Sequence, residues 1–134
     1  MIEVKNIKKV FGDKTIIEDV SSVMKAGQCN LIIGASGSGK TVLMKCMVGL
    51  FEPNEGEVLY SGESFTAMTG SDKTEIRKQI GMLFQGSALF DSQTVEQNVM
   101  FPLNMFTKDS YKEKLRRVNE VLERVNLVGA NKKF

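Results

Sequence analysis

The sequence predicts an α/β fold, and three observations carry that prediction. Residues 2–11 alternate apolar and polar side chains, as expected for a strand with one buried face. A glycine-rich run at residues 34–41 separates an apolar segment from a helix-forming segment. An amphipathic helix begins near Ser110, where Glu113, three residues later, completes a candidate capping box. Strands therefore come first, followed by a loop with its helix and then by a mixture of both elements.

The first half of the chain predicts short strands punctuated by glycine turns, at residues 2–11, 14–17, 20–24 and, directly before the glycine-rich run, 29–33. A helix follows the run. Pro53-Asn54-Glu55-Gly56 is expected to turn, after which residues 57–60 return as a strand that ends at Ser61-Gly62. A polar stretch leads into a short helix at about 73–79, and residues 80–84 are predicted as a second buried strand.

Two helices are expected after these strands. Residues 94–100 predict one or two helical turns that stop before Pro102, because proline disfavours a helical conformation in the residue before it. The helix from Ser110 has an apolar stripe of Leu115, Val118, Leu122 and Val125. Gly129 is expected to end this helix. We expect its role to be structural, since a charged outer face is usually just solvated.

Length and composition limit the function classes. The chain has 134 residues, 42% of them hydrophobic, and a net charge of +2, which suits one domain and gives no strong field for a polyanion. Cys29 and Cys46 lie in apolar segments and are expected to pack there, as suits a reducing cytosol. The longest apolar stretch, Val42–Phe51, is broken by Lys45 and too short to span a bilayer. We therefore expect neither secretion nor membrane embedding.

The run Gly34-Ala35-Ser36-Gly37-Ser38-Gly39-Lys40-Thr41 has the spacing of a phosphate-binding P-loop. Its amides can turn inward as an anion nest, and the helix that starts there adds its positive end. Gly34, Gly37 and Gly39 are expected where a Cβ would be penalised. The amides from about Gly37 to Val42 would wrap a β-phosphate, so the run predicts a nucleotide as ligand.

Two side chains distinguish this loop from an ordinary glycine turn. Lys40 would reach the β- and γ-phosphates as a mobile point charge, and the Thr41 hydroxyl would bind Mg²⁺. A structural turn between a strand and a helix needs neither residue. We therefore expect a nucleoside triphosphate with Mg²⁺ at this loop.

Three further segments occur in the order and approximate spacing of one family: Val10-Phe11-Gly12, the turn at 52–58, and residues 80–85. Together with the P-loop they resemble the N-terminal half of an ABC transporter ATPase. The resemblance implies a P-loop NTPase fold of the ABC ATPase type, with an antiparallel β subdomain and a partial RecA-like parallel-sheet core. Residues 81–103 are similar to ATPases of the lipid-asymmetry and organic-solvent-tolerance (Mla) type, which power phospholipid traffic between bacterial membranes.

The resemblance also implies roles for single residues. Phe11 would stack on adenine, and Gln85 would sense the γ-phosphate through Mg²⁺ and the attacking water. Without the resemblance, Phe11 would be a core residue and Gln85 a solvated strand end. Val42 stands where a second hydroxyl is frequent, although its amide can still serve. Lys40 and Gln85 are thus expected in catalysis, and Thr41 and Gln85 at the metal. Contacts with ATP are expected from Phe11, Gly34, Ser36, Gly37, Ser38, Gly39, Lys40, Thr41 and Val42.

An apolar cluster follows Gln85 and consists of Phe90, Val99, Met100, Phe101 and Leu103. In relatives, this region receives a coupling helix from the membrane subunit. Equally, the cluster would close the core of a small helical subdomain. Both interpretations stay open from the residues alone.

Three features that the family needs do not occur in the sequence: a Leu-Ser-Gly-Gly-type signature, an apolar strand ending in Asp-Glu, and a histidine. We therefore expect a domain truncated before the signature, which binds nucleotide without hydrolysing it, whereas the full-length dimer would hydrolyse ATP. Its parts would be a β-rich adenine-side segment at about 1–27, a P-loop core at about 28–85 and the start of a helical subdomain at about 86–130. Unpaired strand edges would favour self-association.

The resemblance implies a second copy of the subunit in a homodimer, transmembrane permease partners, and a peripheral location on the cytoplasmic face of the inner membrane. No nucleic acid beyond the nucleotide is expected. Two other classes stay open here: a soluble ABC-type ATPase acting on ribosomes or DNA, and a P-loop kinase or GTPase. The latter should show an apolar strand ending in a metal-binding Asp, and the sequence has none.

Overall fold

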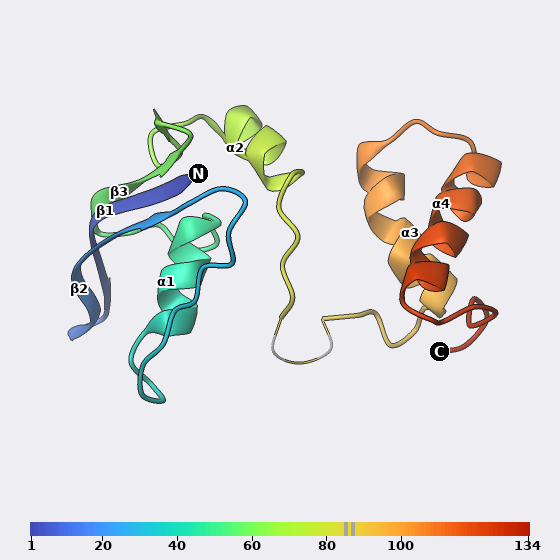
Figure 1. Cartoon of the computed structure of the whole chain (residues 1–134), viewed down its shortest axis with the longest axis horizontal. Coiled ribbons are helices and arrows are strands. Elements are labelled where there is room, and N and C mark those ends of the chain that lie inside the picture. The colour runs from blue at the N-terminus through green and yellow to red at the C-terminus, as the bar shows by residue number, and fades with distance from the viewer. Residues whose placement is uncertain (85, 87) are drawn as a thin grey trace. The chain divides into compact units, whose positions relative to one another are not determined.

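The computed structural model describes residues 1–84, 86 and 88–134, and the chain divides into two compact units, Met1–Gly81 and Met82–Phe134 (Figure 1). The first unit contains the sheet, and the second contains a pair of helices. Each unit has its own hydrophobic cluster. Gln85, the predicted γ-phosphate sensor, lies outside the described residues.

The first unit is built on a four-stranded antiparallel sheet with the order β2-β1-β3-β4. Its strands are β1 (Ile2–Phe11), β2 (Lys14–Met24), β3 (Glu55–Tyr60) and β4 (Glu63–Ser64). The strand predicted at 2–11 is confirmed, and the one predicted at 57–60 begins two residues earlier. The sequence did not indicate β4, which follows a tight Ser61-Gly62 turn with φ angles of 51° and 92°.

β2 is one long strand where the sequence predicts two. The expected interruption at residues 18–19 coincides with a bulge, because the pairing with β1 shifts between Ile7 and Lys9, and Asp19 has φ 52°. Asn6 on β1 donates from Nδ2 to Asp19 Oδ1 at 2.7 Å. The prediction of two strands is therefore wrong, since backbone pairing resumes on both sides of the bulge, at Ile7 with Val20 and at Lys9 with Ile17.

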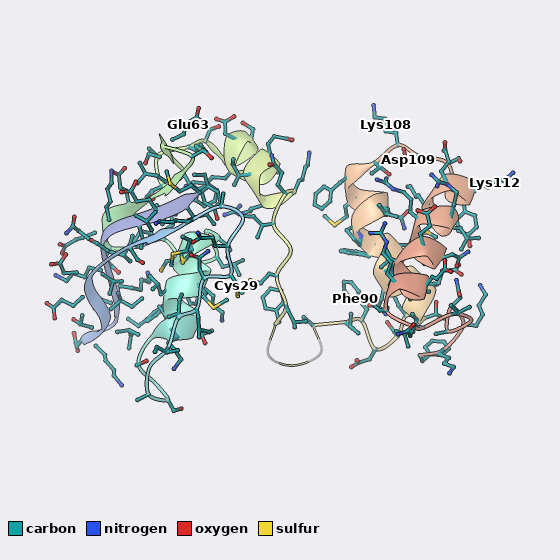
Figure 2. All side chains as sticks on the ribbon, in the orientation of Figure 1. Cys29, Glu63, Phe90, Lys108, Asp109 and Lys112 are labelled. Atoms are coloured by element: carbon teal, nitrogen blue, oxygen red, sulfur yellow. The ribbon has the colours of Figure 1, made fainter. Side chains whose placement is uncertain are left out.

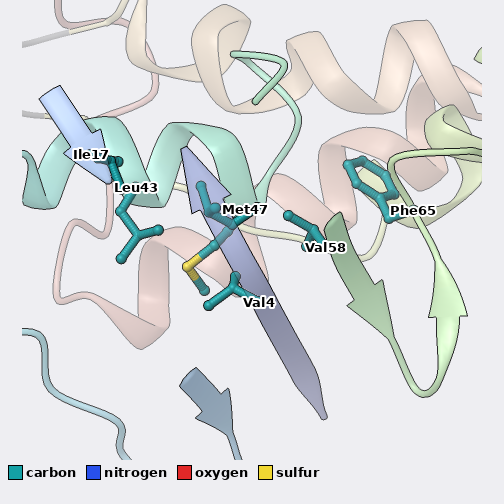
Figure 3. Close-up of a cluster of buried hydrophobic side chains, with 7 residues drawn as sticks. Val4, Ile17, Leu43, Met47, Val58 and Phe65 are labelled. Carbon is teal, nitrogen blue, oxygen red and sulfur yellow. The ribbon is translucent and has the colours of Figure 1, made fainter. Parts of the chain in front are cut away.

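Helix α1 (Lys40–Met47) packs one face against the sheet. Its buried residues Leu43 and Met47 are four positions apart and so share one side of the helix. Figure 3 shows Met47 directed at Val4 of β1, within a cluster that also contains Ile17, Val58 and Phe65. This packing holds the helix, and with it the end of the glycine-rich run, against the sheet.

Helix α2 (Gly70–Arg77) begins before the predicted start at residue 73. The end of the preceding polar stretch forms its first turn, where Asp72 lies near the positive end of the helix. Arg77 donates from Nη2 to the Gly49 carbonyl at 2.7 Å, just beyond the end of α1. The short helix therefore places a cation at the negative end of α1.

Two predictions of buried strands are wrong. Residues 29–33 and 80–84 form no strand in the described part of the chain. Leu31 and Ile33 are each 82% exposed, and Leu83 is 97% exposed. A strand of a parallel sheet is ordered by hydrogen bonds to its neighbours, and the described residues supply no such neighbour. The antiparallel subdomain is therefore formed, while the expected parallel ladder is not.

The two cysteines differ in their surroundings. Cys46 on α1 is buried, and burial raises the pKa of its thiol. Cys29, labelled in Figure 2, is exposed. The expectation that both pack as small apolar residues is thus confirmed for Cys46 and wrong for Cys29, because the segment around Cys29 is not a buried strand.

The second unit pairs α3 (Val95–Phe106) with α4 (Tyr111–Arg124). Met100 of α3 is buried with Val118 and Leu122 of α4. Partly buried apolar residues surround this cluster: Val95, Val99, Leu103 and Leu115. The stripe predicted for the second helix therefore contacts α3 through Leu115, Val118 and Leu122. Its fourth residue, Val125, is 57% exposed and takes no part in this cluster.

Pro102 lies inside α3, so the prediction that the helix stops before it is wrong. A proline inside a helix removes one backbone hydrogen bond and disfavours the preceding turn. Met100 and Leu103, on either side of Pro102, contribute to the cluster with α4. We infer that this packing outweighs the local cost of the proline.

Both helices of the second unit begin with complete capping boxes. Gln97 N donates to Thr94 Oγ1 at 3.3 Å, and Thr94 N donates to Gln97 Oε1 at 2.9 Å. Glu113 N donates to Ser110 Oγ at 3.4 Å, and Ser110 N donates to Glu113 Oε2 at 2.8 Å. The predicted box at Ser110 is confirmed, and the box at Thr94 is an additional one.

Helix α4 ends earlier than the sequence predicts. Asn126 takes φ 58°, and Leu127 N donates to the Leu122 carbonyl at 2.8 Å, as in a Schellman motif. The prediction that Gly129 ends the helix is therefore wrong. Asparagine tolerates the left-handed conformation better than most residues, so it serves here in place of glycine.

The chain after α4 folds back onto the first turn of α3. Val95 N donates to the Lys133 carbonyl at 2.8 Å, and Glu96 N donates to the Asn131 carbonyl at 3.1 Å. The buried Glu96 carboxylate accepts from the Tyr111 hydroxyl at 2.8 Å and from Asn131 Nδ2 at 3.0 Å. These hydrogen bonds, that of Tyr111 first, lower the pKa of Glu96. The second unit thus satisfies its own polar groups around this acid.

Candidate phosphate-binding site

Helix α1 starts directly after the glycine-rich run, with Gly39 as its N-cap and Lys40 and Thr41 as its first two helical residues. The first N–H groups of a helix have no partner within it and carry the positive end of its dipole. Within the described residues, no side chain caps this end of α1, and its first turn contains no acid. The helix therefore presents free donors to an anion.

Backbone angles require glycine at two points of the loop, and a third glycine has a close neighbour. Gly37 has φ 77° and Gly39 has φ 89°, which other residues rarely adopt. A Cβ on Gly39 would also lie 3.0 Å from the Ile16 carbonyl oxygen, and one on Gly34 would lie 2.8 Å from Ser38 Oγ. The loop thus uses glycine both to curl and to approach β2 closely.

Lys40 is folded back over its own loop. Its Nζ donates to the carbonyl oxygens of Gly34 at 2.8 Å and Ala35 at 2.7 Å. These acceptors are neutral, whereas a hydrogen bond between an ammonium and a phosphate oxygen has charge on both sides and is stronger. The flexible stem of lysine allows one set of acceptors to replace the other. The loop therefore holds a cation that an anion can capture.

The remaining predicted residues of the loop divide into exposed hydroxyls and one anchor. Ser36, Ser38 and Thr41 are exposed, and Ser38 N donates to the Ala35 carbonyl at 3.2 Å, which closes the turn. Val42 is partly buried and packs against the core of the first unit. Its side chain thus anchors the first turn, while its backbone amide belongs to the group with no helical partner.

A cavity of about 360 Å³ lies beside the loop. Its volume falls at the lower end of the range for small-ligand sites. The lining is mainly apolar and comes from β2, the segment before the loop, and the start of α1: Ile16, Ile17, Glu18, Val20, Ile32, Ile33, Ser38, Gly39, Lys40 and Leu43. The sequence analysis missed the contribution of β2, because the pairing of that strand behind the loop leaves no local pattern.

Phe11 ends β1 beside the Gly12 turn, and 43% of it is exposed. Its ring meets that of Phe51 with centroids 5.3 Å apart and planes at 75°, and Lys9 Nζ lies 5.0 Å from its centroid. Phe11 does not line the cavity beside the loop. The structure thus brings the P-loop residues together and places Phe11 in a separate aromatic pair. Phe51 is a residue that the sequence analysis missed.

The apolar cluster in the second unit divides between core and surface. Val99, Met100 and Leu103 pack with α4, as the core interpretation predicts. The rings of Phe90 and Phe101 contact each other at a tilt, with centroids 4.9 Å apart and planes at 58°, and both remain partly exposed. The core interpretation therefore accounts for three of the five residues.

Two features are absent from residues 1–84, 86 and 88–134. No group of three His, Cys, Asp or Glu side chains could hold a metal ion there. No helix in that part of the chain has the length and apolar character needed to cross a membrane.

A glycine loop with a lysine in the first turn of an uncapped helix, packed on a sheet, defines the P-loop class of nucleotide-binding domains. A sequence profile of the ABC transporter family matches residues 17–134. The chain belongs to this family.

Relatives with known names support the assignment. The chain is 40% identical to the Probable ribonucleotide transport ATP-binding protein mkl of Mycobacterium leprae (strain TN) over 99% of its own length. It is 44% identical to the Methionine import ATP-binding protein MetN of Escherichia coli (strain K12) over 95% of its length. The chain spans 38% of the length of each of these relatives.

Solved structures confirm the predicted fold class. The chain resembles a dimeric bacterial ABC transporter cassette with a TM-score of 0.87 at 31% identity. It also resembles a dimeric ATP-binding cassette in a post-hydrolysis state bound to ADP and Pi, with a TM-score of 0.86 at 30% identity. Each match covers 99% of this chain and 61% of the other. The kinase, GTPase and ribosome- or DNA-directed alternatives gain no support from these similarities.

Proposed function

We propose that this chain binds ATP through its P-loop as the N-terminal portion of an ABC transporter nucleotide-binding domain, and that the full-length protein hydrolyses ATP. One observation carries the proposal: α1 has no side-chain cap within the described residues, and its first turn carries Lys40 and Thr41. A triphosphate supplies the dense negative charge that these groups lack. Both relatives are named as ATP-binding proteins, which supports the choice of nucleotide.

In this proposal, the triphosphate replaces the protein's own carbonyls as the partner of Lys40. The ammonium leaves the oxygens of Gly34 and Ala35 and binds the β- and γ-phosphates, where both partners are charged. The other phosphate contacts are assigned to the loop and the first turn of α1: Ser36, Gly37, Ser38, Gly39, Thr41 and Val42. Phe11 is assigned to the adenine ring, which its exposed surface can stack against.

Mg²⁺ enters with the nucleotide in this proposal. Within the described residues no cluster of acidic or sulfur and nitrogen ligands could hold the ion by itself. The exposed Thr41 hydroxyl fits Mg²⁺, which accepts a hard oxygen together with phosphate oxygens and water. We assign Thr41 and Gln85 to the metal, and Lys40 and Gln85 to hydrolysis in the full-length protein. The metal would neutralise charge on the phosphate oxygens.

Family membership motivates the assignment of parts and partners. We assign residues 1–27 to the adenine side, 28–85 to the P-loop core and 86–130 to the start of a helical subdomain. A second copy of the subunit and transmembrane permeases are the proposed partners, at the cytoplasmic face of the inner membrane, and no nucleic acid is involved. The dimeric state of both solved relatives and the transport names of the curated ones support these partners.

Phospholipid or another lipid is the proposed transported substrate, because residues 81–103 are similar to lipid-asymmetry ATPases. The curated relatives are named for ribonucleotide and methionine transport, so the substrate needs a direct assay. The full-length protein, reconstituted with its permease in vesicles, should move labelled phospholipid when ATP is added. Uptake of methionine or ribonucleotide without lipid movement would contradict the lipid proposal.

Calorimetry with ATP, inorganic tripolyphosphate and adenosine tests the phosphate site. Lys40→Ala should weaken both polyphosphate ligands by about 10- to 100-fold, the scale of a hydrogen bond to a charged group, and leave adenosine unchanged. Lys25→Ala removes an exposed lysine of the same unit outside the loop and is the matched control. If Lys40→Ala weakened all three ligands equally, Lys40 would merely support the fold.

A further inference from the structure

Phe11 lies at the tip of a hairpin, where the backbone alone does not restrict the rotamer of its side chain. It is the last residue of β1, and it pairs with Lys14 across a two-residue turn in which Gly12 has φ 55°. The residue keeps 43% of its surface exposed. A ring at a hairpin tip would sample several rotamers unless its neighbours restrict it. The contacts that restrict Phe11 therefore bear on any ligand that stacks against it.

Phe51 is the main such neighbour. The two rings have centroids 5.3 Å apart and planes at 75°, the edge-to-face geometry that aromatic pairs prefer. Lys9 adds a second contact, with its Nζ 5.0 Å from the Phe11 centroid and donating to the Glu52 carbonyl at 2.7 Å. Both contacts lead from Phe11 to the segment directly after α1.

This segment is tied to β1 on one side and to α1 on the other. Val10 N donates to Asn54 Oδ1 at 2.9 Å. Phe51 N donates to the Lys45 carbonyl at 3.1 Å, and Lys45 Nζ lies 5.2 Å from the Phe51 centroid. Lys45 belongs to α1, about 7.5 Å along the helix axis from Lys40. A continuous series of contacts thus joins the exposed ring to the phosphate-binding helix.

We propose that Phe51 is a positioning residue for base recognition. It restricts the ring of Phe11 and, through its contact with Lys45, fixes the position of that ring relative to the phosphate loop. The inference rests on the proposed function, in which Phe11 stacks on the base. Phe51 needs no contact with the nucleotide. If the ring of Phe11 is already oriented, binding of the base costs less side-chain entropy than if the base must order the ring.

Calorimetry on the full chain with ATP and inorganic tripolyphosphate separates base recognition from phosphate recognition. Phe51→Ala should weaken ATP by about 2- to 10-fold, the scale of one aromatic pair, and leave tripolyphosphate unchanged. Phe51→Tyr keeps the ring and should bind ATP as the wild type does. Phe51→Leu keeps the apolar volume without the ring and should behave as Phe51→Ala, which covers the case in which the alanine variant unfolds.

Leu50→Ala is the matched control, since it truncates a half-exposed apolar neighbour and should leave both affinities unchanged. Two results would overturn the proposal. An equal loss of ATP and tripolyphosphate binding in Phe51→Leu would show that Phe51 only supports the fold. Unchanged ATP binding in Phe51→Leu would show that Phe11 needs no partner.

A double-mutant cycle with Phe11 distinguishes failure of this inference from failure of the proposed function. Phe11→Ala alone should weaken ATP relative to tripolyphosphate, and adding Phe51→Ala should cause no further loss, because coupled residues are not additive. If Phe11→Ala left ATP unchanged, the base-stacking role itself would fail. If Phe11→Ala weakened ATP and Phe51→Ala added an independent loss, only the positioning role would fail.

Discussion

Helix α1 of the first unit begins in the opposite way to the two helices of the second unit. In the second unit, α3 and α4 begin with capping boxes at Thr94 and Ser110, and each has an acid, Glu96 or Glu113, in its first turn. In the first unit, α1 begins at Gly39 with neither a side-chain cap nor a first-turn acid within the described residues. The capping boxes of α3 and α4 satisfy part of their first N–H groups within the protein. We infer that α1 leaves its own first N–H groups for a ligand.

Helix α2 falls between these two cases and helps to separate stability from binding. Its N-cap Thr69 makes no capping bond to the backbone, but Asp72 in its first turn matches the positive end. The absence of a cap alone is therefore not the distinguishing feature of α1. What distinguishes α1 is an uncapped start that follows a glycine curl and carries a lysine.

The largest effect is expected from removing the packing between α1 and the sheet. Leu43 is buried between α1 and the sheet, so Leu43→Ala should lower the free energy of unfolding of the first unit by about 2–4 kcal/mol. Urea unfolding followed by circular dichroism measures this loss. Met44→Ala, at an exposed position of the same helix, is the control and should change stability little. Equal losses of stability in the two variants would mean that α1 does not pack against the sheet through Leu43.

Gly39→Ala tests the curl itself. The substitution forces a non-glycine residue to φ 89° and sets its Cβ 3.0 Å from the Ile16 carbonyl, so we expect a loss of about 1–2 kcal/mol and at least about tenfold weaker tripolyphosphate binding. Gly27→Ala shares the positive φ but meets nothing within 4 Å. It should lose stability without losing the ligand. If Gly39→Ala kept the full tripolyphosphate affinity, the glycine curl before α1 would not be needed for binding.

Ser110→Ala removes the N-terminal cap of α4 in the second unit. Loss of the capping box should destabilise α4 by about 1 kcal/mol, without any change in polyphosphate affinity. Hydrogen exchange of α4 amides measures the first expectation, and calorimetry measures the second. Ser71→Ala, at a serine of α2 that is not its N-cap, is the control. A weaker ligand in Ser110→Ala would show that the cap also affects binding.

The smallest effect is a pH dependence confined to the second unit. Hydrogen bonds from Tyr111 and Asn131 lower the pKa of Glu96 in the folded state. The resulting stability is present above the ordinary glutamate pKa of about 4.3 and is lost as pH falls through the lower folded value. The urea midpoint should therefore fall with acidification in the wild type and less in Glu96→Gln. Glu123→Gln, at an exposed position of α4, should keep the wild-type slope.

Local signals predicted three parts of the fold correctly. The alternation in β1, the glycine run before α1 and the capping box at Ser110 each lie within a few residues, and all three are found in the structure. Predictions failed where distant parts of the chain decide the outcome. Among the described residues, 29–33 have no neighbour of the kind that a parallel strand needs, and Pro102 stays in its helix because of packing with α4.

The candidate site divides in the same way. Gly39, Lys40 and Thr41 are adjacent in sequence, so their spacing is enough to predict where they lie. The partnership of Phe51 with Phe11 depends on how the segment after α1 is pinned to β1, and no short pattern encodes that contact. The same holds for the β2 side chains that line the cavity beside the loop.

The hydrogen bonds of Lys40 to the Gly34 and Ala35 carbonyls mean that a ligand must displace these carbonyls before it can bind the ammonium. Any incoming molecule competes with two amide dipoles before it gains the ammonium, and an uncharged nucleoside offers nothing that would win that competition. A polyanion does, at the expense of part of its intrinsic affinity. Lys40 would thus discriminate between charged and uncharged compounds, independently of any aromatic residue that stacks on the base.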